Sequence, residues 1–199
     1  RSGVEALSKI AVDLKVSIPV GKDSLSMRTK WSENNSDYEV SSPLSGVITA
    51  MAPVDDVTES VTPELNTSDD TSILLIKLNN KNRLAGSIFS EITETKYQHT
   101  PDIDDIEVFE KLFSGIQNLL KSKKILAMHD ISDGGLITTL LEMCFTKKVG
   151  MRLNLDDSSG VNEFLFSEEI GFAIQIKKNN LDEITKILKN EDLYVKNIA

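Results

Sequence analysis

The chain has 199 residues, of which 40% are hydrophobic and 27% charged, so it can build one large domain or two small ones around a buried core. Its formal net charge of −9 argues against a nucleic-acid or anionic-membrane partner, although a local anion site remains possible. The single cysteine, Cys144, excludes an intramolecular disulfide, and no apolar run approaches the roughly 20 residues that span a bilayer. We therefore expect a cytoplasmic protein that binds neither nucleic acid nor membranes.

The first third of the sequence predicts one helix followed by strands. Apolar residues at helical spacing indicate an amphipathic helix over residues 3–14. Residues 16–20 are a short β-type run, residues 25–31 alternate like a half-buried strand, and residues 46–54 read as another strand, with a polar loop over 32–37 between the last two. Strands of this kind need partners, so we expect these segments to present an apolar surface.

An acidic, Thr-rich stretch interrupted by Pro63 predicts a domain boundary, with a linker over residues 63–70. The elements expected beyond it are a strand at 73–78, a short helix at 84–92, a helix from Asp104 with a capping box to Glu107, a strand at 125–129, a helix at 135–146, strands at 150–155 and 171–177, a helix at 181–190 and a strand from Leu193. From residue 125 onward this order is the split βαβ arrangement. It predicts an α+β sandwich.

The stretch KILAMHDISDGGL carries the most chemical information. It predicts an apolar strand that ends in a carboxylate, then a Ser-Asp-Gly-Gly turn, and then the start of a helix. Phosphates bind at strand ends and helix N-termini, where unpaired N–H groups and the helix dipole point outward. Asp130 is a hard oxygen ligand suited to Mg²⁺, Ser132 and Asp133 are polar neighbours, and Gly134 and Gly135 let a ligand approach the backbone. The alternative is a structural turn, with Ser132 or Asp133 as the helix cap.

A second candidate site is the turn in PVGKDSLSM. Lys22 would meet a phosphate as a point charge, with Asp23 and Ser24 beside it. The turn is not a P-loop, because the glycine run before the lysine is missing and a strand follows it. A plain hairpin turn whose polar residues face water is the alternative.

Taken in this order and separation, GKDSLSM and HDISDGGL, with LLEMCF after the second and NEFLFSEEIGFAIQI further on, resemble the formylglycinamidine ribonucleotide synthases in their large, single-chain form. The resemblance covers nearly the whole chain and includes SSPLSGVITAMAPVDDV. HDISDGGL alone is typical of a wider superfamily that includes aminoimidazole ribonucleotide synthetase. GKDSLSM followed by MRTKW is narrower and indicates the second synthetase half.

This resemblance implies part of an ATP-dependent amidotransferase that converts formylglycinamide ribonucleotide, glutamine and ATP to formylglycinamidine ribonucleotide in purine biosynthesis. Residues 1–62 would be the end of the second N-terminal, barrel-forming domain. Residues 71–199 would be most of the C-terminal α+β domain of the aminoimidazole-ribonucleotide-synthetase-like superfamily. Asp130 would bind Mg²⁺, and Ser132 would contact ATP or ADP, at an auxiliary and largely structural nucleotide site.

Both ends of the chain look cut, since the helical pattern starts near residue 1 and a strand pattern still runs at Ala199. By resemblance, the remaining metal ligands, a glycine-rich nucleotide loop and the glutaminase domain would lie elsewhere in the same polypeptide. We therefore assign no catalytic residue here and expect the segment alone to lack synthetase activity. The alternatives are another superfamily member, such as aminoimidazole ribonucleotide synthetase, or a nucleotide-binding module with a structural role only.

Five further residues have side chains that could be mistaken for catalytic groups. Cys144 lies on the apolar face of its helix and is expected in the core. For His129 an acid–base role competes with a neutral ring that orders the strand end, and we favour the ordering role. His99 is expected to be solvated, and Glu168 and Glu169 are interpreted as loop charges or partners for a neighbouring domain.

Overall fold

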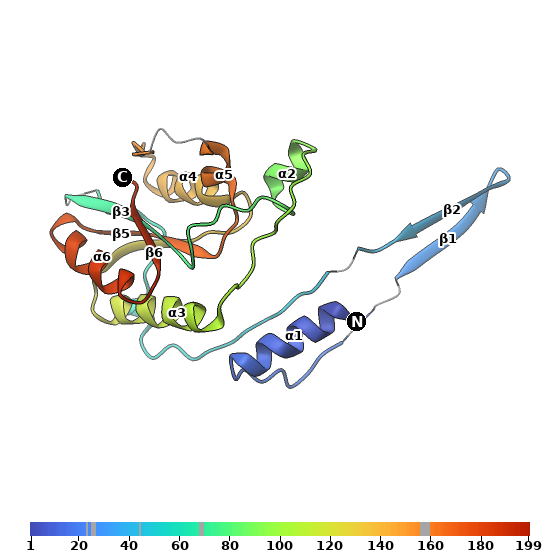
Figure 1. Ribbon diagram of the computed structural model, residues 1–199, viewed down its shortest axis with the longest axis horizontal. Helices are drawn as coiled ribbons and strands as arrows, with labels where there is room; N and C mark the ends of the chain where they lie inside the picture. The colour runs from blue at the N-terminus through green and yellow to red at the C-terminus, as the bar shows by residue number, and fades with distance from the viewer. Residues whose placement is uncertain (23, 25–26, 44, 68–69, 156–159) are drawn as a thin grey trace. The chain divides into compact units, whose positions relative to one another are not determined.

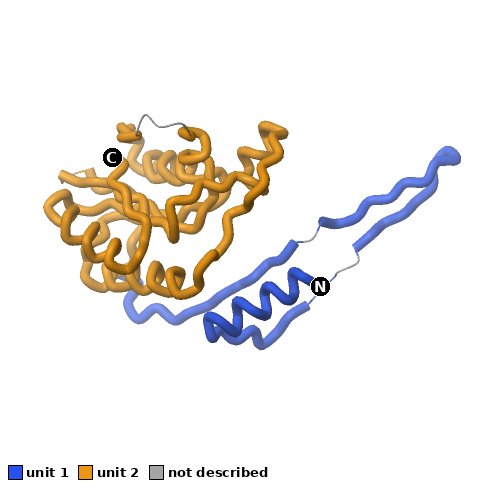
Figure 2. Tube along the Cα trace, in the orientation of Figure 1, with its two compact units in different colours: residues 1–58 blue, residues 59–199 orange. Residues whose placement is uncertain are grey.

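The computed structural model describes residues 1–22, 24, 27–43, 45–67, 70–155 and 160–199 (Figure 1). The chain forms two compact units, Arg1–Thr58 and Glu59–Ala199 (Figure 2). None of the helices in the described ranges combines the length and the apolarity that crossing a membrane requires.

The first unit contains one helix, α1 (Ser2–Asp13), where the sequence predicts it. The predicted strands at residues 16–20 and 46–54 are wrong, because the described backbone there is irregular. A strand exists only where its N–H and C=O groups find a neighbouring strand. In the described part of this unit, such pairing occurs only between β1 and β2.

An antiparallel hairpin joins β1 (Arg28–Glu33) to β2 (Ser36–Ser41), with Trp31 opposite Tyr38. The strand predicted at 25–31 is confirmed from Arg28 onward, but the loop expected at 32–37 is wrong except at its tip. Asn34 and Asn35 lie there with φ of 52° and 61°, as a two-residue turn of the primed type requires, and asparagine tolerates this conformation. The stacked rings of Trp31 and Tyr38, 5.3 Å apart, stabilise the pairing across the strands.

Apolar side chains of the first unit are exposed, as the sequence predicts for residues 16–31 and 46–54. Val47 is 95% exposed and Met51 is 92% exposed. The other exposed apolar residues in those ranges are Val16, Ile18, Val20, Met27, Trp31, Ile48 and Val54. Exposed apolar side chains in such number favour association.

We therefore expect the 199-residue chain to self-associate as its concentration rises. Replacing Val47 and Met51 by serine should weaken this association, because it removes two large exposed apolar side chains. Sedimentation velocity over a range of concentrations measures the effect. A single species whose sedimentation coefficient does not change with concentration would contradict the prediction.

The second unit is built on a four-stranded sheet in the order β4-β5-β3-β6 (Figure 1). Every neighbouring pair in it is antiparallel. The strands are β3 (Thr71–Lys77), β4 (Ile125–Asp130), β5 (Gly171–Lys177) and β6 (Tyr194–Asn197). These strands confirm four of the predicted segments.

The split βαβ arrangement is present, but its first strand is β3 and not the segment at residues 125–129. The strand expected at 150–155 is wrong: residues 151–155 form no strand, although the Asn154 N–H donates to the Ile198 carbonyl at 2.8 Å. The strands therefore follow one another as β3, β4, β5 and β6, with α3 between the first two and α6 between the last two. An α+β fold results, as the sequence predicts.

Two helices, α3 (Ile106–Lys121) and α6 (Leu181–Lys189), cover one face of the sheet, and α4 (Gly135–Lys147) covers the other (Figure 1). β3 supplies both cores, because alternate side chains of a strand point to opposite faces. Leu74 and Ile76 join the core of α3 and α6, whereas Ile73 and Leu75 join the core of α4. Burial on both faces explains why TSILLIK is a continuous apolar run.

Two helix starts differ from their predicted positions because of capping. The N-cap of α3 is Asp105 and not Asp104, and its carboxylate accepts hydrogen bonds from the Glu107 and Val108 N–H groups. The helix predicted from Leu84 begins only at α2 (Ile88–Ile92), where Ser87 caps the Ser90 N–H. A further short helix, α5 (Val161–Phe166), has no counterpart in the sequence prediction. Single 3₁₀ turns lie at Val57–Glu59 and Lys178–Asn180.

The segment before β3 packs against the rest of the second unit. Leu65 is buried in the α4 core. The Asn66 N–H donates to the Gln175 side-chain oxygen, and the Gln175 amide donates back to the Asn66 carbonyl, both at 2.8 Å. These contacts satisfy a buried glutamine in the middle of the sheet, so part of the segment expected as a linker has a structural role.

Gly171 begins β5 at a point where the neighbouring strand leaves no room for a side chain. A Cβ atom there would lie 2.3 Å from the Ile76 carbonyl oxygen. We expect Gly171→Ala to lower the free energy of unfolding by about 1–3 kcal/mol or more through overpacking. Urea unfolding of the chain measures this value. Gly150→Ala is the control, because its Cβ would meet nothing within 4 Å, and an equal loss in both variants would contradict the prediction.

Candidate functional site

The candidate site is the turn between β4 and α4, which contains Asp130 at the strand end and Gly135 at the helix start. Three hydrogen bonds shape it. The Ile131 N–H donates to the Gly171 carbonyl at 2.9 Å, the Gly135 N–H donates to the Ser132 carbonyl at 3.0 Å, and the Thr139 hydroxyl donates to the Asp130 carbonyl at 2.9 Å. The turn is therefore tied to β5 and to the first turns of α4.

The two glycines of the turn are required by the backbone. Gly134 and Gly135 have φ of 85° and 73°, in the left-handed region that favours glycine. A Cβ atom on Gly135 would lie 2.6 Å from the Phe166 carbonyl carbon, and one on Gly134 would lie 2.3 Å from the Thr138 hydroxyl oxygen. Turn geometry thus accounts for both glycines, and the close approach of a ligand to them stays a prediction.

The polar side chains of the turn face solvent. Asp130 is 62% exposed, and Ser132 and Asp133 are also exposed. Neither Ser132 nor Asp133 caps α4: its N-cap is Gly134, which provides no side-chain hydrogen bond. The turn thus offers a carboxylate and a hydroxyl beside a helix N-terminus, a chemistry suited to Mg²⁺ and phosphate oxygens.

The donor set fits a magnesium ion that is shared with phosphates. Within the described ranges, no cluster of three or more His, Cys, Asp or Glu side chains is arranged to hold a metal. Mg²⁺ usually takes only one or two carboxylates and completes its shell with water and phosphate oxygens. Asp130, exposed and ending a strand, is suited to that limited role.

His129 links the end of β4 to α4. Its Nδ1 atom lies 2.9 Å from the Asp130 backbone oxygen and 3.1 Å from the Asp130 Oδ1 atom. Its Nε2 atom lies 2.9 Å from an oxygen of Glu142, on α4. Both ring nitrogens thus lie within hydrogen-bond distance of oxygen atoms, and the ordering role at the strand end stays a prediction.

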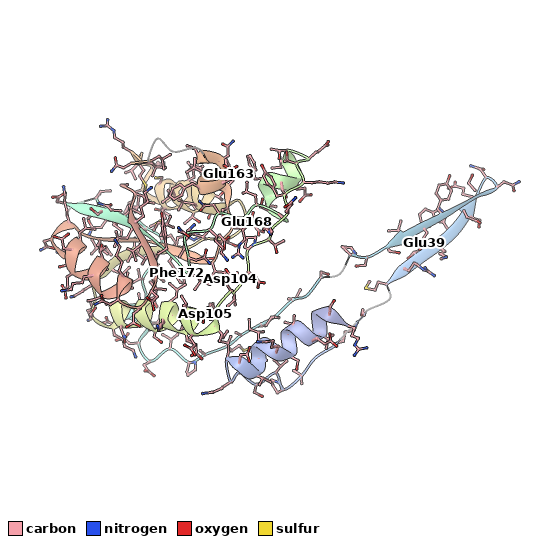
Figure 3. All side chains as sticks on the ribbon, in the orientation of Figure 1. Glu39, Asp104, Asp105, Glu163, Glu168 and Phe172 are labelled. Atoms are coloured by element: carbon pink, nitrogen blue, oxygen red, sulfur yellow. The ribbon has the colours of Figure 1, made fainter. Side chains whose placement is uncertain are left out.

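Glu168, from a segment outside the turn, accepts a hydrogen bond from the turn backbone. Its Oε1 atom accepts a hydrogen bond from the Gly134 N–H at 2.9 Å and another from the Ile88 N–H, also at 2.9 Å. It lies directly after α5, between that helix and β5 (Figure 3). Glu168 is expected as a loop charge or a partner for a neighbouring domain. In the structure its carboxylate joins the turn to the start of α2.

The neighbouring Glu169 is buried in an ion pair. Its side chain is 4% exposed and accepts from the Arg83 Nε and Nη2 atoms at 2.6 and 2.7 Å, while the Arg83 backbone N–H also donates to it at 3.1 Å. The hydrogen bonds to Glu169 raise the pKa of the Arg83 guanidinium above its usual range. Glu169 lies in a loop, as expected, but it is buried and its partner Arg83 belongs to the same unit and not to a neighbouring domain.

Asp104 extends this network toward solvent. It pairs with Arg83 at 3.1 Å and with Lys81 at 3.0 Å. The hydrogen bond from Lys81, with a further one from Arg83, lowers the pKa of the Asp104 carboxyl. These contacts explain why Asp104 does not cap α3 and leaves that role to Asp105.

Lys77, at the end of β3, is the buried cation of this region. Its Nζ atom donates to the Lys81 carbonyl and to the Asn82 side-chain oxygen, both at 2.6 Å, and lies 5.2 Å from the centre of the Tyr194 ring. Burial lowers the pKa of Lys77 to about 8, although the negative charge of Glu169 opposes this shift.

The other candidate residues belong to other segments of the chain. Lys22 and Ser24 are exposed residues of the first unit, and Asp23 lies outside the described residues. Cys144 is buried in the α4 core, which confirms its expected role, and burial raises the pKa of its thiol. His99 is exposed, as expected.

Sequence reasoning missed the contributions of Arg83, Glu168 and Glu169. Two adjacent carboxylates directly before a buried strand were one available signal, since a buried charge needs a partner. That partner, Arg83, lies 86 residues earlier in the chain, so local pattern does not reveal it.

Two protein-family models match the chain. The family model "AIR synthase related protein, C-terminal domain" matches residues 70–199, and the model "FGAR-AT PurM_N-like domain" matches residues 2–53. Because the first match covers more than half of the sequence, the chain belongs to the AIR synthase related proteins. Together the two matches confirm the resemblance to the formylglycinamidine ribonucleotide synthases.

Solved structures from Thermotoga maritima share the fold. PurL complexed with ATP has a TM-score of 0.56 at 15% identity, and the match covers 71% of this chain and 23% of that one. PurL complexed with FGAR has a TM-score of 0.53 at 13% identity, covering 71% and 25%. Phosphoribosylformylglycinamidine synthase II has a TM-score of 0.51 at 13% identity, covering 69% and 22%. The chain thus spans about a quarter of the length of these proteins.

Stability should depend on pH through Lys77. Its pKa is about 8 when folded and about 10.4 when unfolded, so between these values the unfolded chain binds more protons. Stability should therefore rise with pH across this window, by roughly 2 kcal/mol. Below pH 8 the lysine is charged in both states, and its contribution no longer changes.

The test is urea unfolding of the wild type and Lys77→Met at pH 7, 8, 9 and 10. The difference in unfolding free energy between the two should grow above pH 8 in favour of the wild type. Cys144 acts in the opposite direction, because burial raises the pKa of its thiol and the unfolded chain loses that proton more readily, but this effect is common to both proteins and cancels. A difference that stays constant with pH would refute the role of Lys77.

Proposed function

We propose that this chain is part of a formylglycinamidine ribonucleotide synthase, an ATP-dependent carbon–nitrogen ligase that takes its nitrogen from glutamine. The observation that carries the proposal is the occurrence, in one chain, of an FGAR-AT PurM_N-like match at residues 2–53 before an AIR synthase C-terminal match at residues 70–199. The motifs GKDSLSM and HDISDGGL, one in each matched segment, support it. The full enzyme would bind formylglycinamide ribonucleotide, ATP and glutamine, and a glutaminase domain would be a partner within the same polypeptide.

The proposed domain organisation follows the same matches. Residues 1–62 would be the end of a barrel-forming synthetase domain, residues 63–70 its connection, and residues 71–199 the following α+β domain. Exposed apolar side chains such as Val47 and Met51 support the first assignment, since a barrel would cover them.

Within this enzyme, the turn after β4 would hold an auxiliary nucleotide. Asp130 would bind Mg²⁺, and Ser132 would contact ATP or ADP, with Asp133, Gly134 and Gly135 beside it. Lys22, Asp23 and Ser24 would supply a second contact to the phosphates. Mg²⁺, when bound, neutralises phosphate charge, and the exposed Asp130 carboxylate would anchor it to the end of β4.

The central test is Asp130→Asn in the full-length enzyme. Asparagine keeps the size and one oxygen but removes the charge, so Mg²⁺ loses an anionic ligand and no cavity forms. We expect less co-purifying nucleotide and a lower melting temperature, because a ligand at a hundred times its Kd adds about 2.7 kcal/mol of stability. Ser132→Ala should act in the same direction but less, since it removes one neutral hydrogen bond worth about 1 kcal/mol.

Nucleotide is quantified after denaturation, and melting is followed with and without added Mg²⁺ and ADP. Glu191→Gln is the matched control, because it removes one exposed carboxylate after α6. Full nucleotide content and unchanged melting in Asp130→Asn would show that Asp130 is only a turn residue.

Glutamate formation from glutamine that depends on formylglycinamide ribonucleotide tests the enzyme class. Its absence would leave another member of the superfamily or a structural module.

A further inference from the structure

A single carboxylate oxygen joins two segments that are far apart in the sequence. The Glu168 Oε1 atom accepts from the Gly134 N–H, in the turn before α4, and from the Ile88 N–H, at the start of α2. Hydrogen bonds to an ionised carboxylate are stronger than those between neutral groups. The turn that carries Asp130 and Ser132 is thereby attached to a second element by one side chain.

The position of Glu168 is fixed by the residues before it. Phe166 stacks on Phe89 of α2, with ring centres 4.6 Å apart. The Phe166 backbone also leaves no room for a Cβ atom on Gly135. The chain that leads into Glu168 thus touches both elements that its carboxylate connects.

The residue after Glu168 fixes it from the other side. Glu169 is held by the buried, two-pronged ion pair with Arg83, in the loop that leads into α2. Such a pair constrains direction as well as distance. With both neighbours anchored, Glu168 has little freedom to leave the two N–H groups.

α4 has no side-chain cap of its own, and its N-cap residue is Gly134. The carboxylate of Glu168 therefore provides the side-chain hydrogen bond at this helix start that the sequence around the turn does not provide. Glycine at two successive positions makes a turn conformationally free unless other contacts restrict it. Holding Gly134 restricts the backbone from which Ser132 and Asp133 project.

We propose that Glu168 is a positioning residue for the nucleotide site. It would hold the turn of residues 130–135 in the conformation that binds a magnesium-bound nucleoside diphosphate or triphosphate, and would not touch the nucleotide itself. This inference rests on the proposed function. Direct phosphate contact is disfavoured because Glu168 is itself an anion, and because displacing it would break the bond to Ile88 as well.

Three substitutions of Glu168 in the full-length protein separate the effect of side-chain length from the effect of its negative charge. Glu168→Gln keeps an acceptor oxygen at the same reach, Glu168→Asp keeps the charge but shortens the side chain, and Glu168→Ala removes both. Glu163→Ala, on α5, is the matched control. The affinity for Mg²⁺-ADP is measured by calorimetry, and the exchange rates of the Gly134 and Ile88 amides are measured alongside.

We expect Glu168→Ala and Glu168→Asp to weaken Mg²⁺-ADP binding by about tenfold or more, the equivalent of one lost hydrogen bond, with faster exchange at Gly134. Glu168→Gln should stay within about threefold of the wild type, and Glu163→Ala should be unchanged. If Glu168→Ala does not fold, the comparison of the aspartate and glutamine variants carries the test.

Three results would overturn the inference. Unchanged affinity in Glu168→Asp and Glu168→Ala, with faster exchange at Gly134, would leave Glu168 a structural role only. Tighter binding in Glu168→Ala would mean that the carboxylate competes with phosphate. Wild-type protein that binds no Mg²⁺-ADP would overturn the proposed function itself, and the positioning role with it.

Discussion

The contact between Gly135 and the backbone of Phe166 is the constraint on which the candidate site depends. Because Gly135 has no side chain, the start of α4 can lie against the segment that follows α5. Glu168 is then within reach of the Gly134 N–H, and Glu169 can enter the interior and pair with Arg83. Any side chain at position 135 would push these elements apart, and the turn would lose its external hydrogen bond.

Charge in the second unit is arranged in two ways, according to burial. Glu169 is buried and receives two side-chain hydrogen bonds from the partly buried Arg83, which is the condition under which a buried charge is tolerated. Asp130 is exposed, and within the described ranges its carboxylate contacts the ring of His129, so it remains available to a cation. This contrast separates a structural ion pair from a candidate ligand, although both carboxylates lie at the ends of strands or just before them.

Family membership and fold agree with each other over the second unit. The match to AIR synthase related proteins covers the α+β unit, and the solved structures extend the likeness of fold over about 70% of the chain. These proteins are about three times as long as this chain, because a match to 71% of it covers 23% or 25% of them. Apolar residues of the first unit, among them Val47 and Met51, are exposed, whereas those of the second unit form two buried cores.

Local pattern in the sequence determined most of the helices and strands of the α+β unit, because burial on a sheet face or a helix face repeats with a fixed period. It identified β5, α3 and the core position of Cys144, and it located the turn that carries Asp130. Only the tertiary structure decided that residues 150–155 form no strand and that Glu169 is buried. Strand pairing and ion pairing join residues that are distant in the chain. The spacing of neighbouring residues does not reveal which distant residue a strand or a charged side chain will contact.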